Sequence, residues 1–267
     1  KGGVAIATGG FSANQAMVAK IDPKLKGFAT TNQPGATGDG IIMGEKVGAA
    51  TVDMKQIQTH PTVVPGNGEM ITEAVRGNGA ILVNHEGKRF YNELETRDNV
   101  SAAILKQTDK NAFLFFDSDM QKSLKATNNY IKQSYTVTGN SLDEIAAKMK
   151  VPAAALKQTM TEYAAAVAAK NDKQFGRADL PRPLNKAPFY AIIVTPAVHH
   201  CMGGIKIDTK TQVYGQNGQI IPGLFAAGEV TGGVHGGNRL GGNAQADIVT
   251  FGHIAGQQAY IYTRLNK

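Results

Sequence analysis

Three groups of residues in this sequence carry side chains suited to chemistry. The first joins IQTHPT (57–62) to MITEAVRG (70–77), the second is ETRD (95–98), and the third joins VHHCMGG (198–204) to GGNRLGG (236–242). Together they supply histidines, arginines and a glutamate, without a cluster of carboxylates and without a Ser/His/Asp pattern. Arginine forks bind carboxylates in a bidentate way and stay charged, and imidazoles add donors. The inventory therefore favours binding of a small anion over metal binding or nucleophilic catalysis.

The individual residues differ in how strongly they indicate a site. Arg239 stands among many glycines, where an arginine has little packing role, so it is the best candidate on its residues alone. Glu73 and Arg76 are three apart and would be neighbours on a helix, either as a solvent-facing pair or as a hydrogen-bonded chain. Adjacent strand residues point to opposite faces, so only one of the two histidines at 199 and 200 should face a ligand, and we expect His199. For Arg97 two roles stay open on its residues alone, a surface ion pair with its acidic neighbours or a ligand of an anion.

Glycine-rich turns between strands and helices mark both ends of the chain. GGVAIATGGF opens it, GATGDG (35–40) follows, and TGGVHGGNRLGGN (231–243) comes near the end. Such turns let backbone N–H groups approach a ligand, and the helix that follows favours negative charge. Alternating strand, loop and helix is typical of an α/β nucleotide-binding layer. Ser12, with Gln15 three residues later, predicts the cap of the first helix.

The residues between these turns have a different character. Segments 80–84 and 88–92 predict a β-hairpin, AFLFFD (112–117) predicts a strand, and Ser141 with Glu144 predicts a capping box. A longer helix is expected from Pro152 to about Lys170. We therefore predict a discontinuous α/β nucleotide-binding layer with an inserted α+β domain. The predicted parts are residues 1–55 and 200–267 for the layer and 56–199 for the insertion.

Composition narrows the class of protein. With 42% hydrophobic and 18% charged residues, the 267-residue chain has the balance of a folded globular protein. No apolar run approaches the roughly 20 residues that a membrane-spanning helix needs. The net charge of +7 is spread over scattered lysines, which argues against a nucleic-acid stripe and is compatible with binding small dianions. Cys201 is the only cysteine, so the chain cannot form an internal disulfide or a cysteine-ligated metal site by itself.

The ordered motifs resemble one known family over essentially the whole chain. ATGGF, QTHPT, ITEAVRGNGA, TRD, HHCMGG and AAGEVTGGVHGGNRLGGNA are, together, similar to the flavocytochrome c type fumarate reductases. These belong to the fumarate reductase and succinate dehydrogenase flavoprotein superfamily, and the likeness is strongest to periplasmic tetrahaem flavocytochromes of Shewanella type. The resemblance implies an FAD-dependent oxidoreductase that reduces fumarate to succinate. It also implies that the discontinuous α/β layer is an FAD-binding layer, incomplete in this chain, and that the insertion is a capping (clamp) domain.

The resemblance also implies roles for single residues. Arg97 matches the acid that protonates one alkene carbon while reduced FAD delivers hydride to the other, and Glu73 and Arg76 match the proton relay that feeds it. His199 and Arg239 match the residues that hold one substrate carboxylate, whereas His60 and Thr72 match those that hold the other. Further residues are expected to line the same pocket, and these are Gln58, Met70, Glu73 and Gly242.

The cofactors, partners and location follow from the same resemblance. Non-covalent FAD is expected to contact Thr8, Gly9, Asp39, Glu229, Ala244 and Gln245. A small monovalent cation such as sodium is expected near the site, held mostly through carbonyls by Cys201, Met202, Gly203, Glu229 and Thr231. An electron-donating cytochrome and c-type haems on an upstream domain are implied, together with a periplasmic location. Neither a nucleic-acid partner nor a membrane span is expected.

Alternative functions remain open at this stage. Within the superfamily the rivals are urocanate reductase, aspartate oxidase and ketosteroid dehydrogenase, although two carboxylate grips favour a small dicarboxylate. From another class, the chain could be a non-catalytic fragment, because the Gly-x-Gly-x-x-Gly turn that holds the ADP half of FAD is expected upstream of Lys1. On that reading residues 1–267 alone bind FAD poorly and show negligible turnover. A nucleic-acid binder would instead show DNA affinity that depends steeply on salt.

Overall fold

The computed structural model describes residues 2–266 and divides into two compact units. The two-segment unit comprises residues 1–59 and 198–267, and the middle unit comprises residues 60–197. Strands β3 (Ile57–Val63) and β7 (Phe189–Cys201) each run from one unit into the other. The divisions lie near the predicted limits at residues 55 and 199. It stays a prediction that residues 1–55 and 200–267 form an FAD-binding layer and that residues 56–199 form a capping domain.

Two three-stranded sheets form the frame of the two-segment unit. The first has the order β1-β10-β9 and the second the order β11-β8-β2. Their strands are β1 (Val4–Ile6), β10 (Ile220–Ala226), β9 (Gln212–Tyr214), β11 (Thr231–Gly232), β8 (Gly204–Lys206) and β2 (Thr51–Val52). Strands β1 and β10 are parallel, with Val4 opposite Leu224. Their carboxyl ends therefore share one edge of the sheet, where loops that bind ligands collect in α/β proteins.

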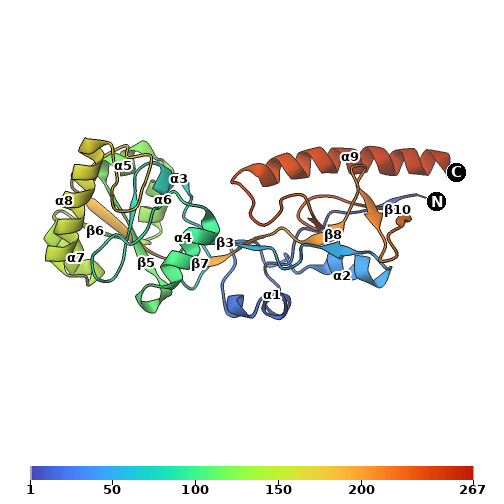
Figure 1. The fold of residues 1–267 in the computed structure, drawn as a ribbon, viewed down its shortest axis with the longest axis horizontal. Helices are drawn as coiled ribbons and strands as arrows, with labels where there is room; N and C mark the ends of the chain where they lie inside the picture. The colour runs from blue at the N-terminus through green and yellow to red at the C-terminus, as the bar shows by residue number, and fades with distance from the viewer. Residues whose placement is uncertain (1, 267) are drawn as a thin grey trace. The chain divides into compact units, whose positions relative to one another are not determined.

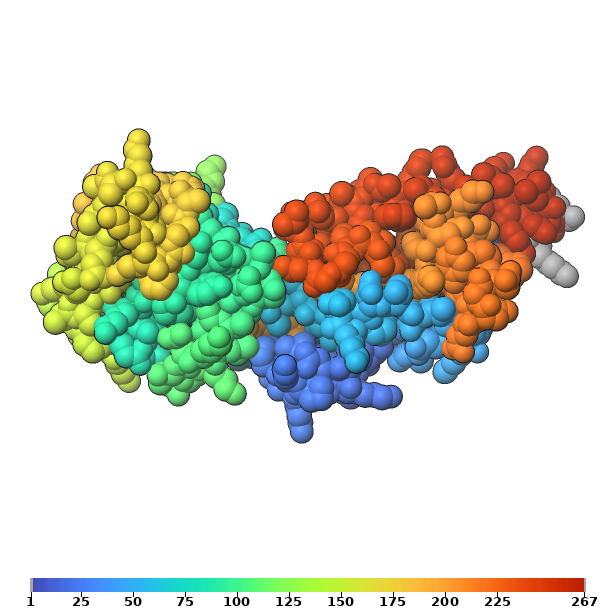
Figure 2. Space-filling model, viewed as in Figure 1, coloured from blue at the N-terminus to red at the C-terminus, as the bar shows by residue number. Residues whose placement is uncertain are grey.

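The helices of this unit cover the strands from two sides (Figure 1). They are α1 (Gln15–Ile21), the short 3-10 helix η1 (Pro23–Leu25), α2 (Asp39–Lys46) and α9 (Asn243–Leu265). Helix α9 runs over β10 on the surface of the unit, as the space-filling view also shows (Figure 2). Helix α2 lies on the other side, and its Ile41 is fully buried together with Phe11 and Ile205. This α/β packing accounts for the buried apolar residues of both chain ends.

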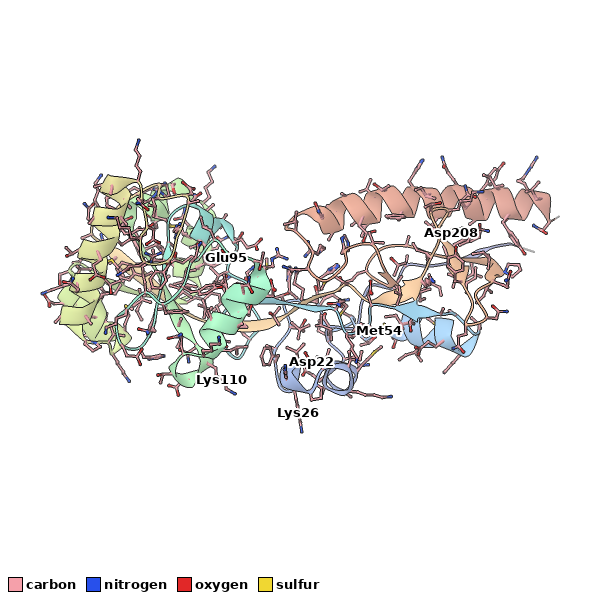
Figure 3. The ribbon with its side chains drawn as sticks, viewed as in Figure 1. Asp22, Lys26, Met54, Glu95, Lys110 and Asp208 are labelled. Carbon is pink, nitrogen blue, oxygen red and sulfur yellow. The ribbon has the colours of Figure 1, made fainter. Side chains whose placement is uncertain are left out.

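The first helix begins later than the sequence predicts. Asn14 caps α1, and its side chain accepts a hydrogen bond from the Met17 backbone N–H at 3.0 Å. Ser12 is buried and accepts a hydrogen bond from Asn32 Nδ2 at 2.7 Å, so its predicted role as the cap is wrong. After α1 the chain turns through η1, which Asp22 and Lys26 flank (Figure 3).

A five-stranded sheet forms the core of the middle unit. Its order is β3-β7-β5-β4, with β6 also pairing with β7. The strands besides β3 and β7 are β4 (Ile81–Val83), β5 (Ala112–Asp117) and β6 (Thr136–Gly139). All six residues of β5 are buried, as expected for a central strand with both faces covered.

Helices surround this sheet, most of them short (Figure 1). They are α3 (Ala74–Gly77), α4 (Arg97–Leu105), the 3-10 helix η2 (Thr108–Lys110), α5 (Ser118–Ser123), α6 (Ala126–Lys132), α7 (Leu142–Met149) and α8 (Ala153–Ala169). Glu95 and Lys110, labelled in Figure 3, stand before α4 and at the end of η2. The Ser141 hydroxyl caps α7 by accepting from the Glu144 N–H at 3.1 Å, which confirms the predicted cap. The predicted hairpin is reduced to β4 and a single bridge between Val83 and Arg89.

No helix between residues 2 and 266 is both long enough and apolar enough to span a membrane.

Candidate functional site

The predicted acid and its partner are in direct contact in the middle unit. Arg97 is the first residue of α4, and Glu73 stands just before α3. Arg97 Nε donates to Glu73 Oε1 at 2.6 Å and Nη2 donates to Oε2 at 2.7 Å. This parallel pair is the bidentate geometry in which a guanidinium binds a carboxylate most strongly. The side chain of Arg97 is 9% exposed and that of Glu73 is 39% exposed, so the pair lies at the edge of the protein interior.

Arg76 extends this pair into the protein. Its Nη2 lies 3.7 Å from Glu73 Oε1, and the residue is buried. Burial lowers the pKa of Arg76 to about 10, against the opposing effect of the Glu73 charge. An arginine with a lowered pKa can release a proton more readily than one in water. Glu73 thus lies between Arg97, which it binds by two hydrogen bonds, and Arg76, at ion-pair distance, and the proton relay through these three residues stays a prediction.

Glu73 is held in its charged form by its neighbours. The hydrogen bond from Arg97 lowers the pKa of Glu73 to about 2, against the opposing effect of burial, and the charges of Arg97, His60 and Arg76 add to the lowering. The stability that this ion pair contributes is therefore complete above the ordinary pKa of 4.5 and is lost as the pH falls toward 2.

We expect Glu73→Gln to destabilise the protein at pH 7, and we expect this loss to shrink below pH 4.5. The reason is that below pH 4.5 the unfolded chain takes up a proton at Glu73 while the folded protein, with a pKa of about 2 for Glu73, does not, so the free energy that the charged carboxylate adds to folding shrinks. Urea unfolding of both proteins between pH 3 and pH 7 measures the difference. Glu69→Gln, at an exposed position in the same unit, is the matched control. A loss that stays constant over this pH range would contradict the expectation.

The other predicted residues of the middle unit lie on β3 and in the segment before α3. His60 is fully buried on β3, and its Nδ1 accepts from the Thr62 N–H at 3.3 Å. The backbone N–H of Thr72 donates to the Tyr130 hydroxyl at 3.1 Å, and Met70 is 37% exposed. His60 and Thr72 are thus fixed near Glu73 by the strand and by Tyr130. Their predicted role in binding a carboxylate stays a prediction.

Arg239 and Gln58 contact each other in the two-segment unit. Gln58 Nε2 donates to the Arg239 carbonyl at 2.7 Å and also to Asn238 Oδ1, while Arg239 Nη2 donates to Gln58 Oε1 at 3.4 Å. Both residues are almost fully buried, at 2% for Gln58 and 6% for Arg239. The loop that carries Arg239 is therefore tied to the start of β3 before it reaches Gly242, the exposed N-cap of α9.

The two adjacent histidines of β7 have different partners. His199 Nδ1 lies 2.7 Å from the Thr31 hydroxyl, whereas His200 Nδ1 lies 3.2 Å from Glu229 Oε2. Glu229 also accepts from the Cys201 N–H at 2.9 Å. Burial acts to raise the pKa of Glu229, but the hydrogen bond and charge of His200 lower it overall. Glu229 is therefore an anion held in a fixed position.

Three of the predicted cofactor residues lie at the shared edge of β1 and β10. Thr8 and Gly9 follow β1, and Glu229 follows β10. A side chain at Gly10 would collide with the Glu229 carboxylate, and a side chain at Gly40 would collide with the Thr8 hydroxyl. The glycines therefore allow these loops and the start of α2 to pack closely, and Thr8 and Asp39 stay exposed.

The start of α9 adds donors to the same unit. No side chain caps its N-terminus and no acidic residue occupies its first turn, so the positive end of the helix is left for a ligand. Ala244 and Gln245 lie in this first turn, and Gln245 is exposed. Asp39 and Glu229 thus supply carboxylates that accept hydrogen bonds from sugar or ribityl hydroxyls, and the start of α9 supplies its positive end for an electron-rich ring. These groups fit part of the FAD molecule.

The residues predicted to hold a small cation are all in the two-segment unit. Cys201, Met202 and Gly203 are consecutive and buried, and the Thr231 hydroxyl donates to the Gly228 carbonyl at 2.8 Å. Burial and the Glu229 charge raise the pKa of the Cys201 thiol. Within residues 2–266 no three His, Cys, Asp or Glu side chains are grouped as metal ligands would be. The cation site stays a prediction that rests on carbonyl oxygens.

Several partners of the site were not found from the sequence. Asn238 next to Arg239 could have been suspected from its place in the glycine-rich loop. Thr31 and Asn32, which hold His199 through its ring and its carbonyl, stand in a segment without a pattern. His235 Nε2 lies 3.0 Å from Asp247 Oδ2, so it has a buried polar partner that spacing alone does not indicate.

Glycine loops at the carboxyl edge of parallel strands, next to the positive end of a long helix, define an α/β protein that binds a nucleotide cofactor. The chain belongs to the FAD binding domain family, whose model matches residues 1–244. The predicted fold, an α/β FAD-binding layer with an inserted α+β part, is confirmed.

Relatives of known function are similar to almost the whole chain. It is 54% identical over 263 residues to a fumarate reductase (cytochrome) of Shewanella frigidimarina, which covers 98% of this chain and 46% of the relative. It is 50% identical over 257 residues to an NADH:fumarate oxidoreductase of Klebsiella pneumoniae, covering 96% of this chain and 28% of the relative. The open conformation of a flavocytochrome c3 fumarate reductase is similar in structure, with a TM-score of 0.81 and 43% identity over 97% of this chain and 46% of the other. The chain thus spans less than half of the length of each.

Proposed function

We propose that this chain carries the substrate-binding part, and one portion of the FAD site, of a fumarate reductase that converts fumarate to succinate. The observation that carries the proposal is the contiguous chain of Arg97, Glu73 and Arg76, in a sequence that is 54% identical to a fumarate reductase over 98% of its length. Bound FAD, once reduced by the electron donor, would supply the hydride for one alkene carbon. The residues expected to hold it are Thr8, Gly9, Asp39, Glu229, Ala244 and Gln245.

Arg97 gives a proton to the other alkene carbon, so the double bond becomes two new C–H bonds. Glu73 then passes a proton back to Arg97 through their bidentate contact. The lowered pKa of Arg76 supports its role as the donor of the next proton to Glu73. His199 and Arg239 hold one carboxylate, with Gln58 and the backbone at Gly242 beside it. His60 and Thr72 hold the other, with Met70 nearby. Cationic groups on both carboxylates stabilise the negative charge that develops during hydride transfer.

The source of electrons and the location belong to the same proposal. The Shewanella relative is named as a cytochrome enzyme, which supports a cytochrome as the electron donor. Haems would then be carried outside residues 1–267, because Cys201 is the only cysteine here. We further propose a periplasmic location and a monovalent cation at the carbonyls around Cys201 and Thr231.

The test is a comparison of substrates with the complete FAD-loaded enzyme and reduced methyl viologen as the donor. We expect fumarate to be reduced faster than urocanate, because two carboxylates match the two groups of cationic and polar side chains. Faster reduction of urocanate would replace the proposed substrate. Failure to reduce either acid would remove the proposed function.

A further inference from the structure

A buried cluster of four charged residues lies behind the proton relay in the middle unit. Arg89 donates to both carboxylate oxygens of Glu93, each at 2.9 Å, and also to Asp172 Oδ2 at 2.9 Å. Arg177 Nη1 donates to Glu93 Oε2 at 3.1 Å. The side chains of Glu93 and Arg177 are 0% exposed, and those of Arg89 and Asp172 are 2% exposed. Two positive and two negative groups are thus paired away from water.

The cluster holds Arg76 at two points. Arg177 Nη2 donates to the Arg76 carbonyl at 2.7 Å, and its Nη1 donates to the Ala80 carbonyl at 2.9 Å. The Arg76 side chain in turn donates from Nη1 to the Glu93 carbonyl at 2.6 Å. Both the main chain and the guanidinium of Arg76 are therefore fixed by residues that sequence reasoning did not connect with the site.

Helix α3 needs such support because it is very short. It has four residues, Ala74–Gly77, and a single turn is not stable by itself in water. The last carbonyls of a helix also lack partners within the helix. Arg177 supplies donors to the Arg76 carbonyl in this turn and to the Ala80 carbonyl just beyond it. Arg177 and Glu93 thus hold this turn in position, and the distance of 3.7 Å between Arg76 Nη2 and Glu73 Oε1 depends on that position.

We propose that Arg177 and Glu93 are positioning residues for the proton relay, acting through Arg76. The proposal rests on the proposed function, since it concerns how the same reaction receives its proton. Neither residue is placed among the groups that contact substrate or FAD. A displacement of about 1 Å in a reacting group can cost about 10²-fold in rate, so a small movement of Arg76 is enough to slow proton delivery.

The test is Arg177→Lys in the complete FAD-loaded enzyme. Lysine keeps the positive charge opposite Glu93. Its ammonium group lacks the planar fork of a guanidinium, so it cannot replace the hydrogen bonds of Arg177 to Glu93 and to the carbonyls of Arg76 and Ala80 together. We expect kcat for fumarate to fall about tenfold or more, with KM little changed and with a larger solvent deuterium isotope effect. Glu93→Gln, which keeps the volume and removes the charge that anchors Arg177, is the second variant if Arg177→Lys does not fold.

Asp172→Asn is the matched control. Asp172 belongs to the same buried cluster, where it pairs with Arg89 and accepts from the Arg177 backbone N–H at 3.4 Å, an acceptor role that asparagine can keep. No hydrogen bond or ion pair joins Asp172 to the Arg177 guanidinium or to Arg76 among the contacts of these residues. We expect it to lower the melting temperature while leaving kcat and the isotope effect close to those of the unchanged enzyme. An equal loss of kcat in Asp172→Asn would show that the cluster acts only through stability, and the proposal would be overturned.

A double variant tests the route through Arg76. In an Arg76→Lys background, Arg177→Lys should cause no further loss of kcat, and an additive loss would overturn the proposal. Exchange of the Arg76 guanidinium protons, followed by NMR, gives a readout without turnover. Faster exchange in Arg177→Lys supports the positioning role even if the enzyme fails to reduce fumarate, in which case only the proposed function falls. Unchanged exchange contradicts the positioning role.

Discussion

Arg97→Ala in the complete FAD-loaded enzyme is expected to lower kcat for fumarate reduction by about 10²–10⁴-fold, the usual contribution of a general acid. Alanine removes the donor that lies 2.6 Å from Glu73 and with it the group that we propose as the acid for the alkene carbon. Reduction of FAD by the viologen should be unaffected, because this step does not use the relay. Stopped-flow oxidation of the reduced enzyme by fumarate measures the loss directly.

Two further variants make this result specific. Arg182→Ala changes another arginine of the middle unit, whose Nη1 donates to the Asp119 carbonyl away from the relay, and it should leave kcat nearly unchanged. Arg97→Lys keeps a charge but loses the bidentate contact, so its rate should lie between those of alanine and arginine. Near-normal fumarate reduction by Arg97→Ala would remove the role assigned to Arg97.

Glu93→Ala is expected to lower the free energy of unfolding by about 3–5 kcal/mol, the usual cost of removing one partner of a buried ion pair. Glu93 is fully buried and accepts from two arginines and from the Leu82 N–H. Its loss leaves the buried Arg177 guanidinium without its carboxylate partner and leaves Arg89 with Asp172 alone. Denaturant unfolding, followed by circular dichroism, measures the difference.

Glu162→Ala is the control for this second result. Glu162 is exposed and accepts hydrogen bonds from the side chains of Gln158 and Gln174, so its replacement should change the free energy of unfolding by well under about 1 kcal/mol. Equal effects of the two variants would mean that the buried cluster contributes no more than a surface contact.

Local patterns in the sequence predicted the elements that local rules control. The cap of α7 follows from Ser141 and Glu144, and the buried face of α8 follows from the spacing of Leu156, Met160 and Tyr163. The contact between Glu73 and Arg76 follows in the same way from a spacing of three residues. Each of these depends on residues that are neighbours along the chain.

Contacts between distant segments could not be predicted in this way. Ser12 and Asn14 are both good helix caps, and the outcome depends on Asn32, which binds the Ser12 hydroxyl. Arg177 and Glu93 are 84 residues apart and carry no shared pattern. The hydrogen bond from Arg177 to the Arg76 carbonyl could not be predicted either, because every residue has a backbone carbonyl and the sequence does not mark which one accepts.

The division of the chain has a consequence for the order of events during synthesis. All residues of the middle unit are consecutive, from His60 to Ala197, whereas β1 must wait for β10 at residues 220–226 before it has its parallel partner. Domains fold as units while the chain emerges from the ribosome. The ion pairs of Glu73 with Arg97 and Arg76, and the buried cluster, can therefore form while the opening strand and the first glycine turn still lack the segment that completes their sheet.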